Sequence, residues 1–252
     1  MVFSIDALVL SKEKLGEIDL LLELLTPNGK IWSIAKGAQK SYKRFVNLLE
    51  EFNFIKAHLR KTSRGKIFIL EKADPIFLPE KIRENYKKYI FLCFIGEVLS
   101  KTNFVGLKIE YFLFIKTLIE SIDTYKFFSL WKPLFELKIL KFSGWTPQLY
   151  KCVKCEYIPK KIFYFSVEKG GIVCYKCKTS ESEYLEIEVI KVLRNLIEVS
   201  NNFERLYKIE EELEKNLLIK EKVLKISEKF FKFFLPFEFN SLKFLKEYVL
   251  GG

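Results

Sequence analysis

The chain has 252 residues, of which 49% are hydrophobic, so it can build two cores or one large core with an insertion. Its apolar runs, such as residues 89–96, are too short to cross a bilayer, which excludes a membrane-spanning protein. Asp6 interrupts the first apolar run, and no basic leader of a secretory signal precedes it. We therefore expect a soluble, cytoplasmic protein with no membrane partner.

The formal net charge is +11, and most of it lies in one N-terminal window. Residues 30–66 contain ten Lys and Arg residues, opposed only by Glu50 and Glu51, which gives this window a net charge of +8. A scattered excess would indicate only a well-solvated surface. A clustered excess favours a polyanionic partner, and nucleic acid is the first candidate.

Residues 1 to about 78 have the pattern of short strands. The Pro27-Asn28-Gly29 turn suits a tight hairpin, and a break separates the third strand from the fourth. The expected strands are Phe3–Leu10, Ile18–Thr26, Gly29–Lys36, Leu48–Arg60 and Lys66–Ala73. Five strands with this break predict an oligonucleotide-binding (OB) barrel, and we place this domain at residues 1–79.

Two groups of basic residues in the predicted barrel are candidate nucleic-acid contacts. The first follows strand three and the second accompanies strand four: Lys36, Lys40, Lys43 and Arg44, then Lys56, Arg60, Lys61 and Arg64. Cations beside aromatic rings suit a single strand, because charges follow phosphates while rings stack on bases. The alternative for Trp32, Phe52 and Phe68 is to fill the barrel interior, and we favour it because small barrels need large side chains inside.

From residue 80 onward the apolar residues follow a helical period. The expected helices include residues 80–101, 107–122 and 131–142, and Ser241 is expected to cap a final helix. The fold class is therefore α+β, with an all-α domain at residues 80–252. We expect a zinc ribbon inserted at about residues 146–180.

Two C-x-x-C pairs, Cys152/Cys155 and Cys174/Cys177, stand eighteen residues apart. Each pair places two thiols on a tight turn, and two such turns can offer four sulfurs to one structural Zn²⁺. Two short strands between the pairs, 163–166 and 170–173, complete a ribbon layout. The alternatives are two disulfides or reduced thiols without metal, and the cytosol disfavours disulfides. The expected cofactor is one structural Zn²⁺ per chain.

The order of these motifs resembles the bacterial DNA repair protein RecO family. The N-terminal motifs that carry the resemblance are residues 7–10, 16–19, 26–30 and 35–38. Farther along are Gly144-Trp145-Thr146-Pro147-Gln148-Leu149, the cysteine block with Gly170-Gly171, and residues 240–245. The sequence departs from the family at Glu156, where glycine is usual, and at Gln39, which interrupts the basic run.

The resemblance implies a recombination mediator rather than an enzyme. Such proteins bind single- and double-stranded DNA, anneal complementary strands and work with the partner RecR. With RecR they help load the RecA recombinase onto DNA coated with single-strand-binding protein (SSB), whose acidic C-terminal tail they recognise.

The residues themselves also argue against catalysis. No phosphate-binding loop of the G-x-x-x-x-G-K-[ST] type is present, and four thiolates would leave a zinc ion no position for a reactive water. Two other functions stay open from the residues alone: a metal-dependent nuclease, and an RNA-binding barrel with a stabilising zinc ribbon.

Overall fold

The computed structural model describes residues 2–41, 44–62, 67–102, 109–126, 129–199 and 203–250. The chain forms two compact units, Met1–Lys126 with Phe239–Gly252, and Phe127–Glu238. The predicted domain boundary between residues 79 and 80 stays a prediction. Within the described ranges, no helix combines the length and the apolar character that crossing a membrane requires.

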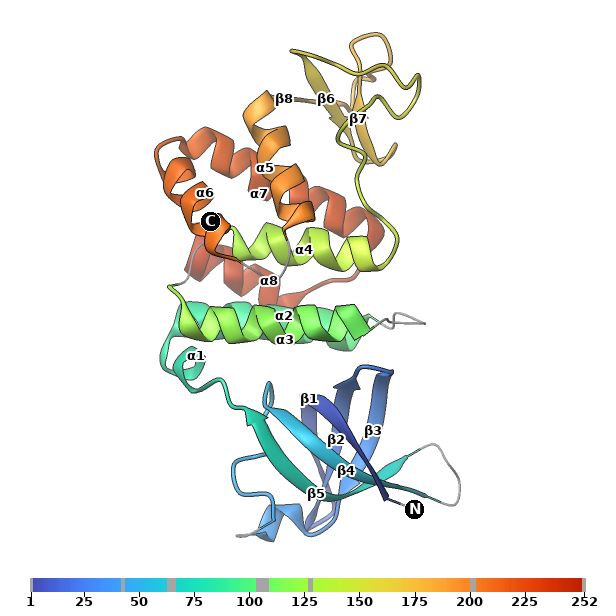
Figure 1. Cartoon of the computed structure of the whole chain (residues 1–252), viewed down its shortest axis with the longest axis vertical. Coiled ribbons are helices and arrows are strands. Elements are labelled where there is room, and N and C mark those ends of the chain that lie inside the picture. The colour runs from blue at the N-terminus through green and yellow to red at the C-terminus, as the bar shows by residue number, and fades with distance from the viewer. Residues whose placement is uncertain are drawn as a thin grey trace. The chain divides into compact units, whose positions relative to one another are not determined.

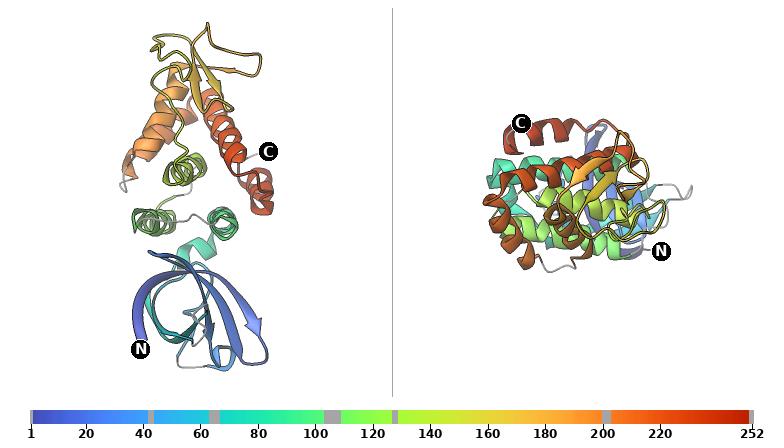
Figure 2. Two further views of the ribbon diagram at one scale, coloured as in Figure 1. Left: turned by 90° about the vertical axis from the view of Figure 1, so that its right-hand side faces the viewer. Right: turned by 90° about the horizontal axis from the view of Figure 1, so that it is seen from above.

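The first unit begins with a closed five-stranded barrel in the order β1-β2-β3-β5-β4, which confirms the predicted OB fold (Figure 1). Its strands are β1 Val2–Leu15, β2 Asp19–Thr26, β3 Gly29–Ala35, β4 Phe54–Lys61 and β5 Phe68–Phe77. All neighbours are antiparallel except β3 and β5. The first half of β1 pairs with β4 and the second half pairs with β2, so this long strand closes the barrel. Figure 2 shows the curvature of the barrel strands.

Small and branched side chains alternate into the barrel interior, among them Ala7, Val9, Ala57 and Leu59. Phe45 and Leu49, from the connection between β3 and β4, also pack into this core.

The predicted fourth strand is wrong at its beginning, because β4 starts at Phe54 instead of Leu48. Asn47 and Phe52 adopt positive φ, which breaks an extended conformation. The buried Asn53 side chain stabilises this loop by donating to the carbonyl oxygens of Asn47 (2.8 Å) and Leu48 (3.1 Å).

Helices of the first unit lie beside the barrel (Figure 1). They are α1 Glu80–Glu84, α2 Tyr86–Lys101, α3 Ile109–Thr124 and α8 Asn240–Leu245, followed by a π-helical turn at Lys246–Leu250. Phe54 packs edge-on against Phe112 of α3, with ring centroids 6.0 Å apart. A Cβ atom at Gly96 of α2 would lie 2.5 Å from the Phe52 ring, so this close approach requires glycine.

The predicted helix over residues 80–101 is divided at Asn85. Its side chain accepts a hydrogen bond from the backbone N–H of Lys88 at 3.2 Å and starts α2. The predicted cap of the last helix is also different. Ser241 donates its own N–H to Glu97 of α2 at 2.8 Å, and Asn240 N–H does so at 3.0 Å, so a carboxylate from α2 caps α8.

The second unit contains α4 Trp131–Phe142, α5 Ile187–Glu198, α6 Glu204–Glu214 and α7 Leu217–Phe234. A small sheet in the order β7-β6-β8 lies between α4 and α5 in sequence, with β6 Phe163–Ser166, β7 Gly171–Val173 and β8 Glu183–Leu185. This sheet confirms the predicted ribbon and adds a third strand to it.

The ribbon is packed against the helices of its own unit. Phe165 meets Phe230 of α7 with ring centroids 5.7 Å apart, and Trp145 stacks on Phe234 at 5.1 Å. Arg194 of α5 donates from Nε to the Leu149 carbonyl at 3.0 Å. These contacts fix the base of the ribbon to α5 and α7.

Candidate nucleic-acid interface and metal centre

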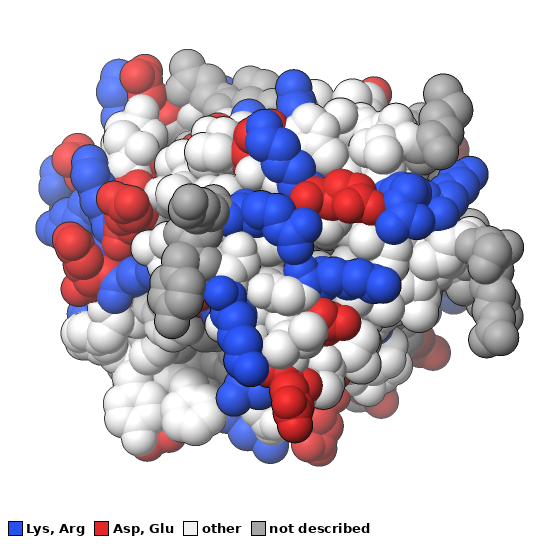
Figure 3. Space-filling model, turned by 90° about the horizontal axis from the view of Figure 1, so that it is seen from below, with Lys and Arg blue, Asp and Glu red and all other residues white. Residues whose placement is uncertain are grey.

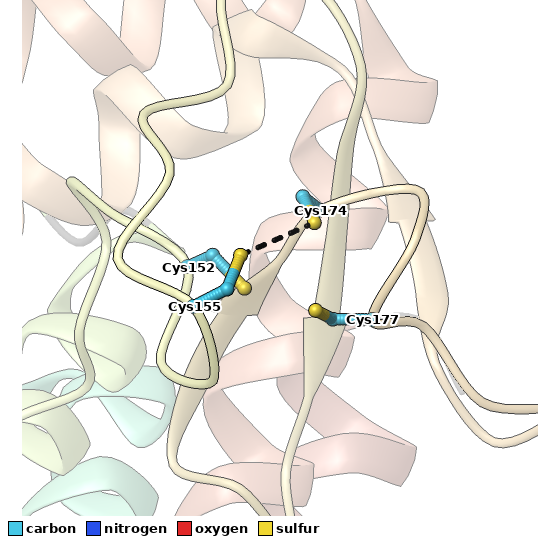
Figure 4. Close-up of side chains that lie close together, drawn as sticks. All are labelled: Cys152, Cys155, Cys174 and Cys177. Carbon is cyan, nitrogen blue, oxygen red and sulfur yellow. Dashed lines mark hydrogen bonds between the residues drawn. The ribbon is translucent and has the colours of Figure 1, made fainter.

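The four cysteines of the two C-x-x-C pairs converge at the tip of the ribbon (Figure 4). Their Sγ atoms all lie within 4.8 Å of one another, and the Sγ atoms of Cys155 and Cys174 are 3.7 Å apart. A tetrahedral Zn²⁺ with Zn–S bonds of about 2.3 Å separates its sulfurs by about 3.8 Å. A disulfide needs about 2.05 Å, and all four residues are free thiols. The geometry therefore fits a metal ion better than it fits disulfides.

Backbone hydrogen bonds hold the thiol-bearing turns in place. Val153 N–H donates to Ile172 O at 2.9 Å and ties the first turn to β7, while Cys177 N–H donates to Cys174 O at 3.0 Å within the second. Burial raises the pKa of Cys152, but N–H groups of Cys174, Cys155 and Lys154 donate to its sulfur and bring the pKa down to about 6. These donors stabilise a thiolate at Cys152.

Crowding among the sulfurs has the opposite effect on Cys177. Its hydrogen bond to Cys174 raises its pKa to about 12, with further contributions from burial and from Cys155 and Cys152. Four sulfurs this close cannot all ionise unless a cation compensates their charge. The cluster can hold one divalent ion.

Glu156, which follows the second cysteine, has a φ of +60°. This left-handed conformation is easy for glycine and costs other residues about 1–2 kcal/mol. The turn keeps it through a hydrogen bond from Glu156 N–H to Cys152 O at 2.9 Å, and the side chain pairs with Lys151 at 2.8 Å. The departure from the family pattern thus leaves the sulfur positions intact.

The first predicted group of basic residues lies on the connection from β3 to β4. Lys36 follows β3, Lys40 ends the short helix η1 (Ala38–Lys40), and Arg44 follows; all three are exposed, while Lys43 lies outside the described residues. Arg44 donates from Nη2 to Lys36 O at 2.5 Å, and its guanidinium carbon lies 5.0 Å above the Phe45 ring. Phe45 is buried in the barrel core, so Arg44 is positioned by the fold.

Gln39 anchors this basic connection. Its side-chain amide donates to Asp19 O at 2.6 Å, and its N–H donates to Ile18 O at 3.0 Å. Gly37 N–H donates to the Asp19 carboxylate at 2.7 Å. The sequence indicated Gln39 only as an interruption of positive charge. Its role in joining the connection to the β1–β2 turn depends on contacts about 20 residues away in sequence.

The second predicted group has carboxylate neighbours. Lys56 and Arg60 project from the outer face of β4, Lys61 ends that strand, and Arg64 lies outside the described residues. Arg60 pairs with Glu71 at 2.6 Å, and the register places Lys56 opposite Asp74 and Asp6. Among the described residues, Lys36, Lys40 and Arg44 form no ion pair with a carboxylate. The connection therefore offers the stronger attraction to phosphates.

A cleft of about 570 Å³ borders the basic connection, and the sequence did not indicate it. It is lined by Lys12, Lys14, Gln39, Ser41 and Val46, among others. The expected first strand stopped at Leu10, whereas β1 continues to Leu15 and carries Lys12 and Lys14 to this place. Figure 3 shows one face of the molecule on which Lys and Arg side chains gather with a few acidic side chains between them.

The aromatic residues of the barrel have different positions. Phe68 is half-buried against the barrel core and meets Phe3 edge-on at 5.6 Å, as the core-packing interpretation predicts. Phe52 is buried, but against α2. The interpretation is wrong for Trp32, which is 40% exposed on the outside of β3. Its neighbour Lys30 donates to Ser100 O at 2.6 Å and so stabilises the end of α2.

Comparison with known proteins decides the family. A family model described as Recombination protein O N terminal matches residues 1–78, and one described as Recombination protein O C terminal matches residues 83–242. The chain belongs to the RecO family. Family membership supports a role in DNA repair and recombination.

Individual RecO proteins align over most of this chain. The DNA repair protein RecO of Thermoanaerobacter sp. (strain X514) is 28% identical over 245 residues, which cover 95% of each chain. That of Alkaliphilus metalliredigens is 25% identical over 98% of this chain and 100% of the relative. That of Myxococcus xanthus is 30% identical over 77% of this chain and 80% of the relative.

Proposed function

We propose that this RecO-family chain is a recombination mediator that binds single- and double-stranded DNA and anneals complementary strands. Together with RecR it helps load RecA onto SSB-coated DNA, in the cytoplasm at the nucleoid. The single observation that carries the proposal is the exposed basic connection of the barrel, where Lys36, Lys40 and Arg44 have no carboxylate partner among the described residues. Membership of the RecO family also supports a role in DNA repair and recombination.

Annealing requires no bond to be made or broken by the protein. Two polyanionic strands repel each other, and a surface that neutralises part of each backbone lowers the barrier to their encounter. The affinity then comes mainly from phosphate contacts and falls as salt rises. A non-catalytic mediator is consistent with this mechanism, because lysine and arginine side chains supply the charge and no reactive group is needed.

The cysteine cluster is proposed to hold one structural Zn²⁺ through Cys152, Cys155, Cys174 and Cys177. Bound zinc would supply cross-linking between the two turns, and four thiolates would fill its coordination shell. We expect one zinc per chain by elemental analysis and a loss of the metal in Cys174→Ser. Full-length protein that folds normally without any metal would contradict this assignment.

The partners follow from the family. RecR and the acidic C-terminal tail of SSB are proposed partners, and the tail is proposed to bind the helical part of the chain. Binding of SSB with and without its tail, measured by a change in fluorescence anisotropy, tests this step. Equal affinity for both forms would contradict recognition of the tail.

The proposed function is tested by annealing of complementary oligonucleotides coated with SSB. We expect the wild-type chain to accelerate annealing and the variant Lys36→Ala/Lys40→Ala/Lys43→Ala/Arg44→Ala to lose most of this acceleration. Labelled strands incubated with Mg²⁺ test for degradation in parallel, because cleavage would indicate a nuclease instead. Preferential binding of RNA over DNA would indicate the other alternative, an RNA-binding barrel.

A further inference from the structure

One face of the ribbon sheet carries a cluster of tyrosines. Tyr164 of β6 and Tyr184 of β8 are directly opposite each other in the strand register, with ring centroids 6.0 Å apart. Tyr175 of the second cysteine turn lies 6.4 Å from Tyr164. The neighbours of Tyr164 in β6, Phe163 and Phe165, are buried, as expected for a strand whose two faces alternate. The tyrosines therefore occupy the solvent side of the sheet.

Two of the three rings in this cluster are exposed to solvent. Tyr175 is 68% exposed and Tyr184 is 48% exposed, whereas Tyr164 is half-buried and packs against the Cys152 and Cys174 cluster. The inner ring thus stabilises the metal turns. The two outer rings leave much of their apolar surface in water.

Lysines accompany the rings. The Nζ atom of Lys178 lies 4.5 Å from the Tyr164 centroid and 4.9 Å from the Tyr175 centroid, and Nζ of Lys222 lies 5.6 Å from the Tyr184 centroid. Lys222 also pairs with Glu186 at 2.5 Å, so the less compensated charge is that of Lys178.

The ribbon as a whole also carries a net positive charge. Residues 146–185, which include all three strands, contain seven lysines and four glutamates, a net charge of +3, which four thiolates and one Zn²⁺ would reduce to +1. One of these glutamates, Glu183, is already paired with Lys225 and Lys229 of α7. The lysines are Lys151, Lys154, Lys160, Lys161, Lys169, Lys176 and Lys178. An anionic partner is complementary to this surface.

We propose that Tyr175, Tyr184 and Lys178 form a second binding site for single-stranded nucleic acid, separate from the basic connection of the barrel. Bases stack on the exposed tyrosine rings, and Lys178 and the other ribbon lysines contact phosphates. Stacking needs only the flat face of each base, so this site does not read sequence. The site rests on the proposed function in one respect: annealing brings two strands together, and a second site can hold the second strand.

The test compares single-strand binding by full-length zinc-loaded variants, with an oligo-dT probe. Tyr175→Ala/Tyr184→Ala removes both exposed rings and is expected to weaken binding at least roughly five-fold for each ring. Tyr175→Phe/Tyr184→Phe keeps the rings and is expected to bind as the wild type does. Tyr157→Ala, a change at another exposed ribbon tyrosine, is the matched control for surface truncation. Metal content confirms that each variant keeps its ribbon.

A direct measurement uses a photoactivated iodouracil probe and maps the cross-linked residues by mass spectrometry. Cross-links to Tyr175 or Tyr184 support the site. Unchanged affinity of the double alanine variant, or equal losses in the alanine and phenylalanine variants, would overturn it. Loss of binding to an acidic peptide probe without any loss of oligo-dT binding would instead assign the surface to a protein partner.

The barrel variant Lys36→Ala/Lys40→Ala/Arg44→Ala, measured beside these, separates the two proposals. If it loses oligo-dT binding while the ribbon variants keep it, the ribbon site fails and the proposed function stands. If the wild-type chain does not bind oligo-dT at low salt, both fail.

Discussion

Replacing Glu156 by glycine should stabilise the ribbon, although it removes a side chain and an ion pair. Glu156 has a φ of +60°, which costs a non-glycine residue about 1–2 kcal/mol. Glycine has more freedom in the unfolded chain, which offsets roughly 0.5–1 kcal/mol of that gain. The Lys151–Glu156 pair is largely exposed and its loss is screened by water and salt. The expected net effect on the free energy of unfolding is a gain of about 0.5–1 kcal/mol.

The assay is urea denaturation of the zinc-loaded protein, followed by a signal from the ribbon, with Glu156→Ala as the matched control. Alanine removes the same ion pair but keeps the Cβ atom that causes the strain. The Glu156→Gly midpoint should exceed the Glu156→Ala midpoint by roughly 0.2–0.5 M urea. Equal midpoints, or a lower midpoint for glycine, would refute the claim that backbone strain is stored in this turn.

Three further predictions concern the acid cap of α8, a buried ion pair and the second basic group. Burial raises the pKa of Glu97, but hydrogen bonds from Lys101, Ser241 and Asn240 outweigh it and hold the pKa at about 2, below the ordinary 4.5. The charged Glu97 side chain therefore stabilises the fold above about pH 4.5, and this stabilisation is lost as the pH falls toward 2. In urea titrations, the difference in stability between the wild type and Glu97→Gln should shrink over that pH range. Lys132 is buried 2.7 Å from Glu136 and 3.1 Å from Glu228, so Lys132→Met, which leaves both carboxylates without this lysine, should cost about 3–5 kcal/mol. Lys132→Met/Glu136→Leu should cost less, because the fully buried carboxylate is also removed and Glu228 keeps its pair with Lys232. Equal losses in denaturation curves would argue against a buried ion pair between Lys132 and Glu136. Arg60→Ala should reduce the salt dependence of DNA binding less than Arg44→Ala does, because Glu71 already compensates the charge of Arg60. A larger reduction in Arg60→Ala than in Arg44→Ala would show that the β4 face is the main contact.

The sequence was sufficient for features whose signal is local. The spacing of the four cysteines predicts the cluster, because two C-x-x-C turns need only a hairpin between them to meet. Strand alternation and the turn at Pro27-Asn28-Gly29 predict the barrel, and β3 starts at Gly29 as expected. Each of these features depends on neighbours in sequence.

Features that depend on distant contacts could not be predicted in this way. The apolar run from Leu48 reads as strand, yet Phe45 and Leu49 pack into the barrel core and Asn53 holds the loop, so β4 starts later. Serine is a residue type that commonly caps helices, and the sequence therefore predicts Ser241 as the cap. The carboxylate that caps α8 instead comes from Glu97, 144 residues away.

The same limit applies to the candidate site. Charge clustering identified the basic connection, since lysines and arginines can be counted. It could not show that Lys30 stabilises the end of α2, that Glu71 compensates Arg60, or that Gln39 anchors the connection. These roles depend on which carboxylates and carbonyl groups the fold brings to each cation.

The most direct test of the account is the slope of log affinity for single-stranded DNA against log salt concentration. The variant Lys36→Ala/Lys40→Ala/Arg44→Ala is compared with Lys191→Ala/Lys208→Ala/Lys215→Ala, which removes the same charge from exposed positions in α5, in α6 and just after α6. Each lost phosphate contact reduces the slope by about 0.7, so the barrel variant should lose up to about 2 from the wild-type slope and the helical variant should lose little. Equal slopes in the barrel variant and the wild type would contradict the claim that the barrel connection binds the phosphate backbone.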